Sequence, residues 1–146
     1  MPNTSLDREV ERRLSERAIR YTRGRHAVVA ALAAADGPLS AAELHETVEG
    51  SLPLSSIYRS LTVLEEVGVL AQHNSAKGLT RFELAEWLKG HHHHLICVEC
   101  GSVEDVLVAA QHESQVDRIV DEISRAASFT PANHALEIEG RCSRCS

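Results

Sequence analysis

The chain has 146 residues, a net charge of −6 and 43% hydrophobic residues, a composition typical of a soluble globular protein. No apolar run approaches the roughly 20 residues that cross a bilayer, and the N-terminus lacks the apolar stretch of a secretory signal peptide. We therefore expect a cytoplasmic protein without a membrane partner. In that reducing compartment, the four cysteines are expected to bind a metal rather than to form disulfides.

The first fifty residues predict three helices. Apolar residues four apart favour a helix over 6–20, and Thr22 is a suitable N-cap for a second helix over 23–35. Asp36-Gly37-Pro38 ends that helix, and Ser40-Ala-Ala-Glu43 is a capping box that opens the third. The first 25 residues are rich in arginine, with Arg8, Arg12, Arg13, Arg17, Arg20, Arg23 and Arg25. A basic segment on an acidic protein fits either contact with an anion or a solvated helix face.

The next segment predicts a winged helix-turn-helix. Residues 55–67 favour a fourth helix, and residues 69–73 and 80–84 favour two short strands joined by a polar hairpin over 74–78. In a winged helix, the last helix before the strands enters the major groove of DNA. Its exposed face offers side chains that can reach phosphates and base edges, namely Ser55, Ser56, Tyr58, Arg59 and Thr62. A small helical bundle without a DNA partner is the alternative.

The rest of the chain predicts a small α/β domain, so the fold class is α+β. A short connector ends in glycine and serves as a hinge, which divides the chain into residues 1–85, 86–90 and 91–146. Beyond the hinge, residues 101–108 favour a hairpin and a strand, and residues 135–140 favour an outer strand. Residues 111–127 between them favour an amphipathic helix. A unit of this size has too little core to stand alone. It therefore needs a metal, a partner subunit or both.

The cysteines form two Cys-x-x-Cys pairs, Cys97 with Cys100 and Cys142 with Cys145. Each pair can hold one side of a tetrahedral ion, and four thiolates leave no open coordination position. That pattern is typical of structural zinc, whose binding contributes directly to folding. Thioredoxin-like redox motifs are the alternative, but neither pair opens a helix after a buried strand. We therefore predict a structural Zn2+ bound by the four cysteines.

Four consecutive histidines, residues 91–94, precede the first cysteine pair. Alternate side chains of an extended strand point to opposite faces, so His92 and His94 share one face and His91 and His93 share the other. This alternation predicts two metal sites back to back. Their further ligands are expected among the acidic and histidine residues Glu83, Asp105, His112, Glu113 and His134. Carboxylate together with imidazole suits Zn2+, Fe2+ or Mn2+.

These segments together resemble the ferric uptake regulator (Fur) superfamily. The resemblance rests on His-His-His-His-Leu-Ile-Cys-x-x-Cys-Gly (91–101), Ser-Ile-Tyr-Arg-Ser-Leu (56–61) and Asn-His-x-Leu-x-Ile-x-Gly-x-Cys (133–142), and it extends from Arg20 to Cys145. Members are homodimeric, metal-responsive DNA-binding proteins, usually repressors, with a winged helix followed by an α/β dimerisation domain. The resemblance implies the same fold and function here, with double-stranded DNA bound at a palindromic operator.

The resemblance also implies roles for individual residues. It places Tyr58 and Arg59 on the recognition helix, and it places an arginine before Thr22, such as Arg17 or Arg20, in the minor groove. It matches the four cysteines to a structural zinc site. It matches a regulatory site at the hinge to Glu83, His92, His94 and Asp105. It matches an additional site in the dimerisation domain to His91, His93 and His134.

The chain departs from the family pattern at several ligand positions. Many members supply a hinge-site ligand just before the third helix, where this chain has Gly37-Pro38-Leu39, with His45 a few residues later. The helix position of the additional site corresponds to His112, with Glu113 beside it. Glu83 stands where peroxide sensors of the superfamily have aspartate, which argues against peroxide sensing.

The expected cofactors are Zn2+ at the structural site and Fe2+ or Zn2+ at the regulatory site, with manganese, nickel or peroxide sensing as alternatives. Two other classes of protein compete with a regulator. A metal-storage or metallochaperone module would not need a winged helix. A metallohydrolase would need a reactive metal site, but the chain has no His-Glu-x-x-His motif, so we expect no enzymatic activity.

Overall fold

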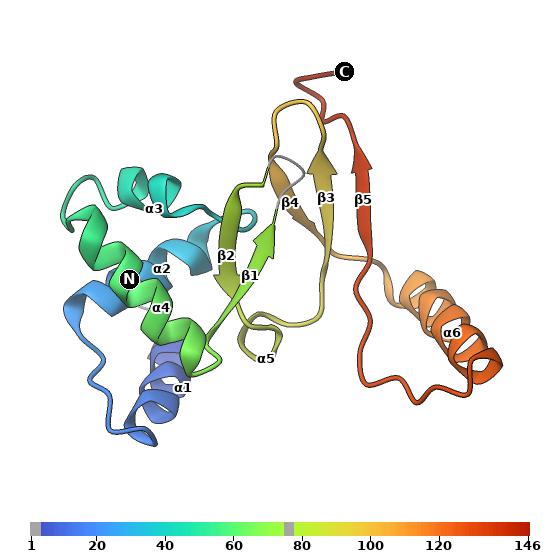
Figure 1. The fold of residues 1–146 in the computed structure, drawn as a ribbon, viewed down its shortest axis with the longest axis horizontal. Coiled ribbons are helices and arrows are strands. Elements are labelled where there is room, and N and C mark those ends of the chain that lie inside the picture. The colour runs from blue at the N-terminus through green and yellow to red at the C-terminus, as the bar shows by residue number, and fades with distance from the viewer. Residues whose placement is uncertain (1–3, 75–77) are drawn as a thin grey trace.

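The computed structural model describes residues 4–74 and 78–146, so residues 1–3 and the middle of the predicted hairpin lie outside the described residues. The elements follow in chain order as α1 (Thr4–Ser15), α2 (Arg23–Ala34), α3 (Ala41–Thr47), α4 (Leu54–Glu66), β1 (Leu70–Asn74), β2 (Thr80–Leu84), α5 (Glu86–Lys89), β3 (His93–Cys97), β4 (Val103–Val106), α6 (Ala110–Ala126) and β5 (Glu137–Gly140). Figure 1 shows helices α1–α4 on one side of the β1–β2 hairpin, and strands β3–β5 with α6 on the other.

Helices α2, α3 and α4 with the β1–β2 hairpin form a winged helix, as the sequence predicts. Strands β1 and β2 are antiparallel, and Ala71 lies opposite Glu83. The predicted capping box at Ser40 and Glu43 is present at the start of α3. Just before it, the Leu39 backbone exchanges hydrogen bonds of 2.9 and 2.7 Å with Phe82. The segment before α3 therefore braces strand β2, which carries Glu83.

The predicted helix over 6–20 is wrong at its C-terminal end, because α1 stops at Ser15. Ala18 has a positive φ of 57°, and the Ile19 N–H donates back to the Leu14 carbonyl at 3.0 Å. This turn redirects the chain, so that Ile19 packs against the core. The hydrogen bond to Leu14 and the positive φ of Ala18 are typical of a helix that ends in a left-handed turn.

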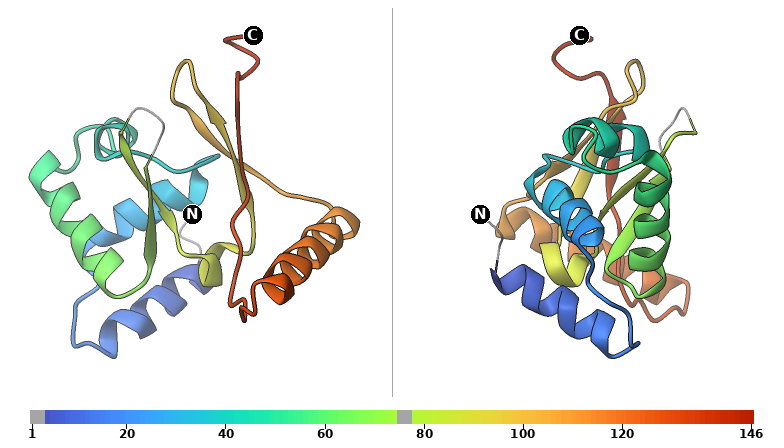
Figure 2. Two further views of the ribbon diagram at one scale, coloured as in Figure 1. Left: turned by 45° about the vertical axis from the view of Figure 1, so that its right-hand side comes forward. Right: turned by 90° about the vertical axis from the view of Figure 1, so that its left-hand side faces the viewer.

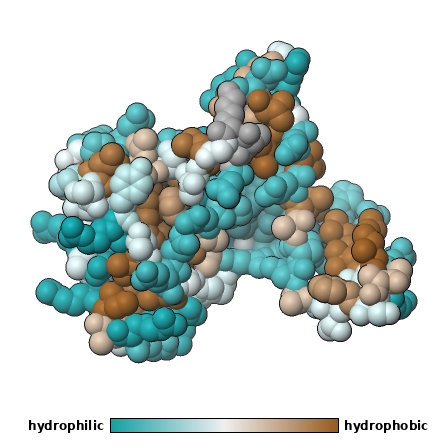
Figure 3. Space-filling model, viewed as in Figure 1, coloured by the Kyte–Doolittle hydropathy of each residue, from teal (hydrophilic) through white to brown (hydrophobic). Residues whose placement is uncertain are grey.

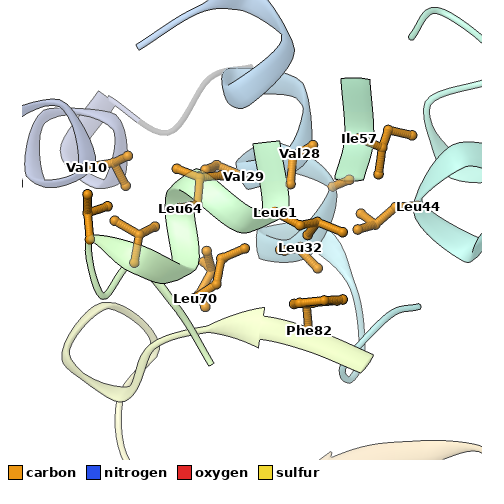
Figure 4. Packing of buried hydrophobic residues seen from close by; sticks show 14 of the residues in the cluster. Val10, Val28, Val29, Leu32, Leu44, Ile57, Leu61, Leu64, Leu70 and Phe82 are labelled. Carbon is orange, nitrogen blue, oxygen red and sulfur yellow. The ribbon is translucent and has the colours of Figure 1, made fainter. Parts of the chain in front are cut away.

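Apolar side chains from α1–α4 and from the wing form the core of the winged helix (Figure 4). On α4, Ile57, Leu61 and Leu64 are each at most 1% exposed. These residues recur every three or four positions, so they bury one face of α4. The opposite face, which includes Tyr58 and Arg59, is left exposed to solvent.

Replacing Leu61 with alanine is expected to destabilise the protein by about 2–5 kcal/mol, because the substitution leaves a cavity in a closely packed core. The same substitution at Leu54, which lies on the same helix and is 40% exposed, should cost less than about 1 kcal/mol. Urea unfolding followed by circular dichroism measures both losses. Equal losses at the two positions would contradict this description of the core.

Strand β3 is the centre of the second sheet, antiparallel to β4 and parallel to β5. The chain passes from β4 to β5 through α6, which stands away from the sheet in Figures 1 and 2. Ile119 and Ile123 of α6 are 55% and 65% exposed, and Figure 3 shows apolar side chains over this helix. An apolar helix face of this kind is available to a partner. None of the helices in the described part of the chain is long and apolar enough to span a membrane.

Candidate metal centres and DNA-binding face

Within residues 4–74 and 78–146, potential metal ligands gather in groups whose ligand atoms lie within 4.8 Å of one another. We call the first the cysteine cluster, which consists of Cys97, Cys100, Cys142 and Cys145. The hinge cluster consists of Glu83, His92, His94 and Asp105. The histidine cluster consists of His91, His93, Glu113 and His134. One further triad shares a histidine with the hinge cluster and consists of His73, His94 and Glu137.

The cysteine cluster joins the end of β3 to the C-terminal end of the chain. Parallel pairing sets Cys97 beside Gly140, which brings the second cysteine pair next to the first. All four thiols are free, and the Sγ atoms of Cys100 and Cys142 are 3.8 Å apart. A tetrahedron with Zn–S bonds of about 2.3 Å has edges of about 3.8 Å. The donor set and this spacing therefore fit one tetrahedral zinc ion.

The backbone around the first cysteine pair favours a thiolate. Hydrogen bonds from the backbone N–H groups of Cys100 and Cys142 lower the pKa of Cys97 to about 6. The Cys142 N–H lies 3.4 Å from the Cys97 Sγ atom. Thiolate is the form in which cysteine binds metal. The peptide turns thus prepare Cys97 to act as a ligand at neutral pH.

The hinge cluster brings together side chains from the wing and from the second sheet. Glu83 lies on β2, His94 lies on β3, and Asp105 is paired with His94 across the β3–β4 ladder. Glu83 Oε2 is 2.9 Å from His92 Nε2 and 3.3 Å from His94 Nε2. Asp105 Oδ1 is 3.6 Å from His92 Nε2 and 3.3 Å from His94 Nε2. Strand alternation therefore directs both histidines toward the same two carboxylates.

The electrostatics of the hinge cluster suit a cation. Burial alone would raise the pKa of Glu83, but hydrogen bonds with His73, His94 and His92 hold it well below its usual range. Burial alone would lower the pKa of His94, but its interactions with Asp105 and Glu83 raise it to about 9. The buried Asp105 Oδ1 atom has no hydrogen-bond partner. The cluster thus offers two imidazoles and two carboxylates, one of which has an unsatisfied buried oxygen. This donor set fits Zn2+, Fe2+ or Mn2+.

Sequence reasoning missed His73, which lies on β1 beside the hinge cluster. Its Nε2 atom is 2.5 Å from Glu83 Oε1, and its ring centroid is 4.4 Å from that of His94. The signal was available, because His73 lies two residues after Ala71, the partner of Glu83. Residues diagonal to one another on one face of an antiparallel pair can touch through long side chains. His73 thus contacts the Oε1 atom of Glu83, whereas His92 contacts the Oε2 atom.

The histidine cluster is built around one carboxylate. Glu113 Oε1 is 2.8 Å from His91 Nε2 and 2.7 Å from His134 Nε2, and Oε2 is 2.8 Å from His93 Nε2. Although burial has the opposite effect, hydrogen bonds with His93, His134 and His91 lower the pKa of Glu113 to about 2. The buried Nδ1 atom of His93 has no hydrogen-bond partner. Three imidazoles and one carboxylate form a donor set that suits a divalent transition metal.

The structure corrects the expectation for the helix residue of the histidine cluster. Glu113 of α6 enters the cluster, whereas His112 is exposed and does not. Successive residues on an α-helix are about 100° apart around its axis, so adjacent side chains point in different directions. Glu113 on the first turn of α6 faces the β3 histidines. His112 is therefore withdrawn as a ligand of this cluster.

The loop before α3, where a ligand is missing from the family pattern, packs directly on β4. The Asp105 N–H donates to the Asp36 carbonyl at 3.1 Å. A Cβ atom on Gly37 would lie 2.3 Å from the Val103 carbonyl oxygen, so this close approach requires glycine. His45 belongs to none of the ligand groups found in the described residues. The loop thus contributes backbone contacts beside the hinge cluster.

The residues predicted to contact DNA lie on the exposed surface of the winged helix. On α4, Ser55 and Arg59 are exposed, Tyr58 is 55% exposed, and Ser56 is partly buried. Arg17 and Arg20 are exposed in the turn that follows α1. The Arg20 carbonyl accepts a hydrogen bond of 2.6 Å from the Arg25 side chain, which fixes the backbone of this turn. These side chains are free to meet phosphates and base edges.

Comparison with known proteins identifies the family. A family model described as "Ferric uptake regulator family" matches residues 16–139. The chain belongs to this family. It is 30% identical to the ferric uptake regulation protein of Bacillus subtilis (strain 168), over 96% of this chain and 93% of that protein. It is 38% identical to the Legionella pneumophila ferric uptake regulation protein over 63% of this chain, and the match spans 62% of that protein.

Solved structures of Fur proteins show the same fold. The ferric uptake regulator of Helicobacter pylori, described as having three functional metal-binding sites, superposes with a TM-score of 0.79. The two chains are 21% identical, and the superposition covers 97% of this chain and 92% of that one. Fur-family membership confirms the predicted resemblance and the winged-helix fold with a second α/β domain. It also makes the chain a metal-sensing regulator of transcription.

Proposed function

We propose that this member of the Fur family represses transcription from a palindromic operator when Fe2+ or Zn2+ binds the hinge cluster. In this proposal, residues 1–85 bind DNA, residues 86–90 are the hinge, and residues 91–146 dimerise. The observation that carries the proposal is that Glu83 of the wing meets His92 and His94, across the hinge, at 2.9 and 3.1 Å. A ligand set drawn from both sides of a hinge can set the angle between them.

The proposed mechanism is a population shift between hinge angles. Bound metal would supply a positive charge shared by Glu83, His92, His94 and Asp105. Glu83 is fixed on a strand that the Leu39 segment braces, so its carboxylate cannot follow the histidines freely. Holding Glu83 against β3 thus favours one orientation of α4. In a dimer, that orientation would place the two α4 helices about one DNA turn apart, as a palindrome requires.

The second domain supports the proposed homodimer. The apolar side chains of α6, including Ile119 and Ile123, are exposed, and each residue of the edge strand β5 is exposed as well. A two-fold axis beside these elements would cover the same surface on both subunits. We assign the cysteine cluster to a structural Zn2+ and the histidine cluster to an additional metal site within this domain. We also propose a cytoplasmic, non-catalytic role.

Replacing Arg59 with alanine is expected to weaken operator binding about 5- to 150-fold, because an exposed arginine on α4 would contact a phosphate or a guanine edge. Stability should change by less than about 0.5 kcal/mol, since the side chain lies outside the core. Arg125→Ala, which removes an exposed arginine from α6, is the matched control for lost positive charge. Fluorescence anisotropy of a labelled duplex measures the affinity. Equal weakening by both substitutions would contradict the assignment of α4.

Metal binding at the hinge cluster is expected to release about one proton near pH 7. His94, whose pKa is raised to about 9, holds a proton there, and metal requires the neutral imidazole. Apparent affinity should therefore rise about tenfold per pH unit below pH 9 and level off above it. Calorimetry of Mn2+ binding in two buffers of different ionisation enthalpy counts the released protons. The measurement is made in the Glu113→Gln variant, which removes the contribution of the histidine cluster. An affinity independent of pH would contradict proton release from His94.

Operator binding with a panel of metals tests the proposed function. A duplex selected by the protein from a random pool should bind at least tenfold more tightly when Fe2+ or Zn2+ is added to zinc-loaded, otherwise metal-free protein. Fe2+ is kept reduced under anaerobic conditions. Metal binding without any change in DNA affinity would instead indicate a metal-storage or metallochaperone module. A larger response to Mn2+ or Ni2+ would reassign the sensed metal.

A further inference from the structure

A lysine of the hinge lies inside the proposed sensing site. Lys89 Nζ is 3.7 Å from Glu83 Oε2 and contacts Asp105 Oδ2 at shorter range. The Nζ atom is fully shielded from solvent and has no hydrogen-bond partner of good geometry, and the side chain as a whole is 20% exposed. One ammonium group thus interacts with both carboxylates of the hinge cluster. Neither the predicted ligand set nor family membership accounts for it.

The hinge helix holds Lys89 in this position. Helix α5 ends at Lys89, and Gly90 then turns the chain toward β3 with a positive φ of 91°. Trp87 on the same helix donates its indole N–H to the Gly68 carbonyl at 2.8 Å. The Arg13 guanidinium lies 4.3 Å from the centre of the Trp87 ring. Because α5 is docked on the winged helix through Trp87, the backbone of Lys89 is held in place and its side chain lies beside Glu83.

Lys89 and a bound metal ion would compete for the same two carboxylates. Two carboxylates in a partly buried site repel one another and attract any cation. The ammonium group neutralises part of this negative charge. Asp105 directs its Oδ2 atom at Lys89, while its Oδ1 atom faces the imidazoles. A divalent ion bound to the same carboxylates would stand close to the ammonium and repel it. Metal binding must therefore displace Lys89, or the repulsion must weaken the affinity for the metal.

We propose that Lys89 is a tethered cation that competes with metal for Glu83 and Asp105 and so sets the metal concentration at which the protein responds. This inference rests on the proposed sensing role of the hinge cluster. Lys89 stabilises the metal-free site and lowers its affinity for a dication. On metal binding, one cation replaces another at the carboxylates, and the ammonium moves toward solvent. The lysine acts on metal binding without being a ligand.

Direct metal titration tests the competition. Zinc-loaded protein carrying Glu113→Gln, which disables the histidine cluster, is titrated with Mn2+, and free Mn2+ is followed by electron paramagnetic resonance. Lys89→Met should bind Mn2+ about tenfold more tightly than the parent. Lys89→Arg, which keeps the positive charge, should stay within about threefold. Arg12→Met, which removes an exposed positive charge from α1, should leave the affinity unchanged. Unchanged or weaker Mn2+ binding by Lys89→Met overturns the proposal.

Amine labelling provides a second readout that requires no substitution at Lys89. Acetic anhydride treatment followed by peptide mass spectrometry compares Lys89 with Lys77, the other lysine of the chain, with and without Mn2+. Displacement predicts several-fold faster labelling of Lys89 when Mn2+ is bound, and the Glu83→Gln variant should lose this response. Labelling that is unchanged or slower with Mn2+ contradicts displacement. Neither readout involves DNA. If Lys89 competes with metal but metal does not change operator binding, the proposed function is refuted while this inference stands.

Discussion

Replacing Cys97 with serine is expected to remove zinc and unfold residues 91–146. The cysteine cluster joins the end of β3 to the segment that follows β5, and the second sheet has few buried apolar side chains of its own. In such a small domain the free energy of zinc binding is a large part of the free energy of folding. Zinc content should fall from about one ion per chain to nearly none, and the dimer should dissociate.

Elemental analysis, size-exclusion chromatography and circular dichroism measure these losses for Cys97→Ser. Ser143→Ala is the matched control, because Ser143 is exposed and lies between the two cysteines of the second pair without belonging to the cluster. The control should keep its zinc and remain dimeric. A Cys97→Ser protein that stays a folded dimer without zinc would show that the cluster is not structural.

Replacing Glu83 with glutamine is expected to weaken metal binding at the hinge cluster about a hundredfold or more and to abolish metal-dependent operator binding. The substitution preserves the shape of the side chain but removes the charge that His73, His92 and His94 surround. Loss of a residue that only hydrogen-bonds to a metal ligand already lowers metal affinity about 10- to 100-fold. Loss of a ligand itself is expected to lower the affinity more. Folding and zinc content should be retained, because the cysteine cluster is intact.

Anisotropy of the selected duplex, with and without Mn2+, measures this effect of Glu83→Gln. Glu46→Gln, an exposed position on α3, makes the same chemical change outside the ligand groups. That control should keep the full metal response. If Glu83→Gln retained the response while Glu46→Gln also did, metal sensing would have to reside outside the hinge cluster.

The alternation of side chains in an extended strand is the part of the site that the sequence predicted best. It separated His92 and His94 from His91 and His93, and the structure places the two pairs in different ligand groups. The two Cys-x-x-Cys pairs were equally informative, since their spacing permits few other uses. The winged helix followed from the period of apolar residues such as Leu61 on α4. Local periodicity therefore carried most of the fold and much of the site.

Contacts that depend on tertiary packing were harder to predict. The choice between His112 and Glu113 depends on the rotation of α6 about its axis relative to β3, which local sequence does not encode. Lys89 reaches the hinge cluster from α5, a helix that docks through Trp87. α1 stops at Ser15, and the turn that follows brings Ile19 against the core. Such features follow from how elements pack, not from their own patterns.

Metal sensing at the hinge cluster requires reciprocal coupling between metal and DNA. If metal at the hinge cluster strengthens operator binding by some factor, operator DNA must strengthen metal binding by the same factor. The measurement is the affinity for Mn2+ in the Glu113→Gln background, with and without saturating selected duplex. We expect at least tenfold tighter Mn2+ binding in the presence of the duplex, and loss of that gain in Glu83→Gln. The same Mn2+ affinity with and without the duplex would contradict it.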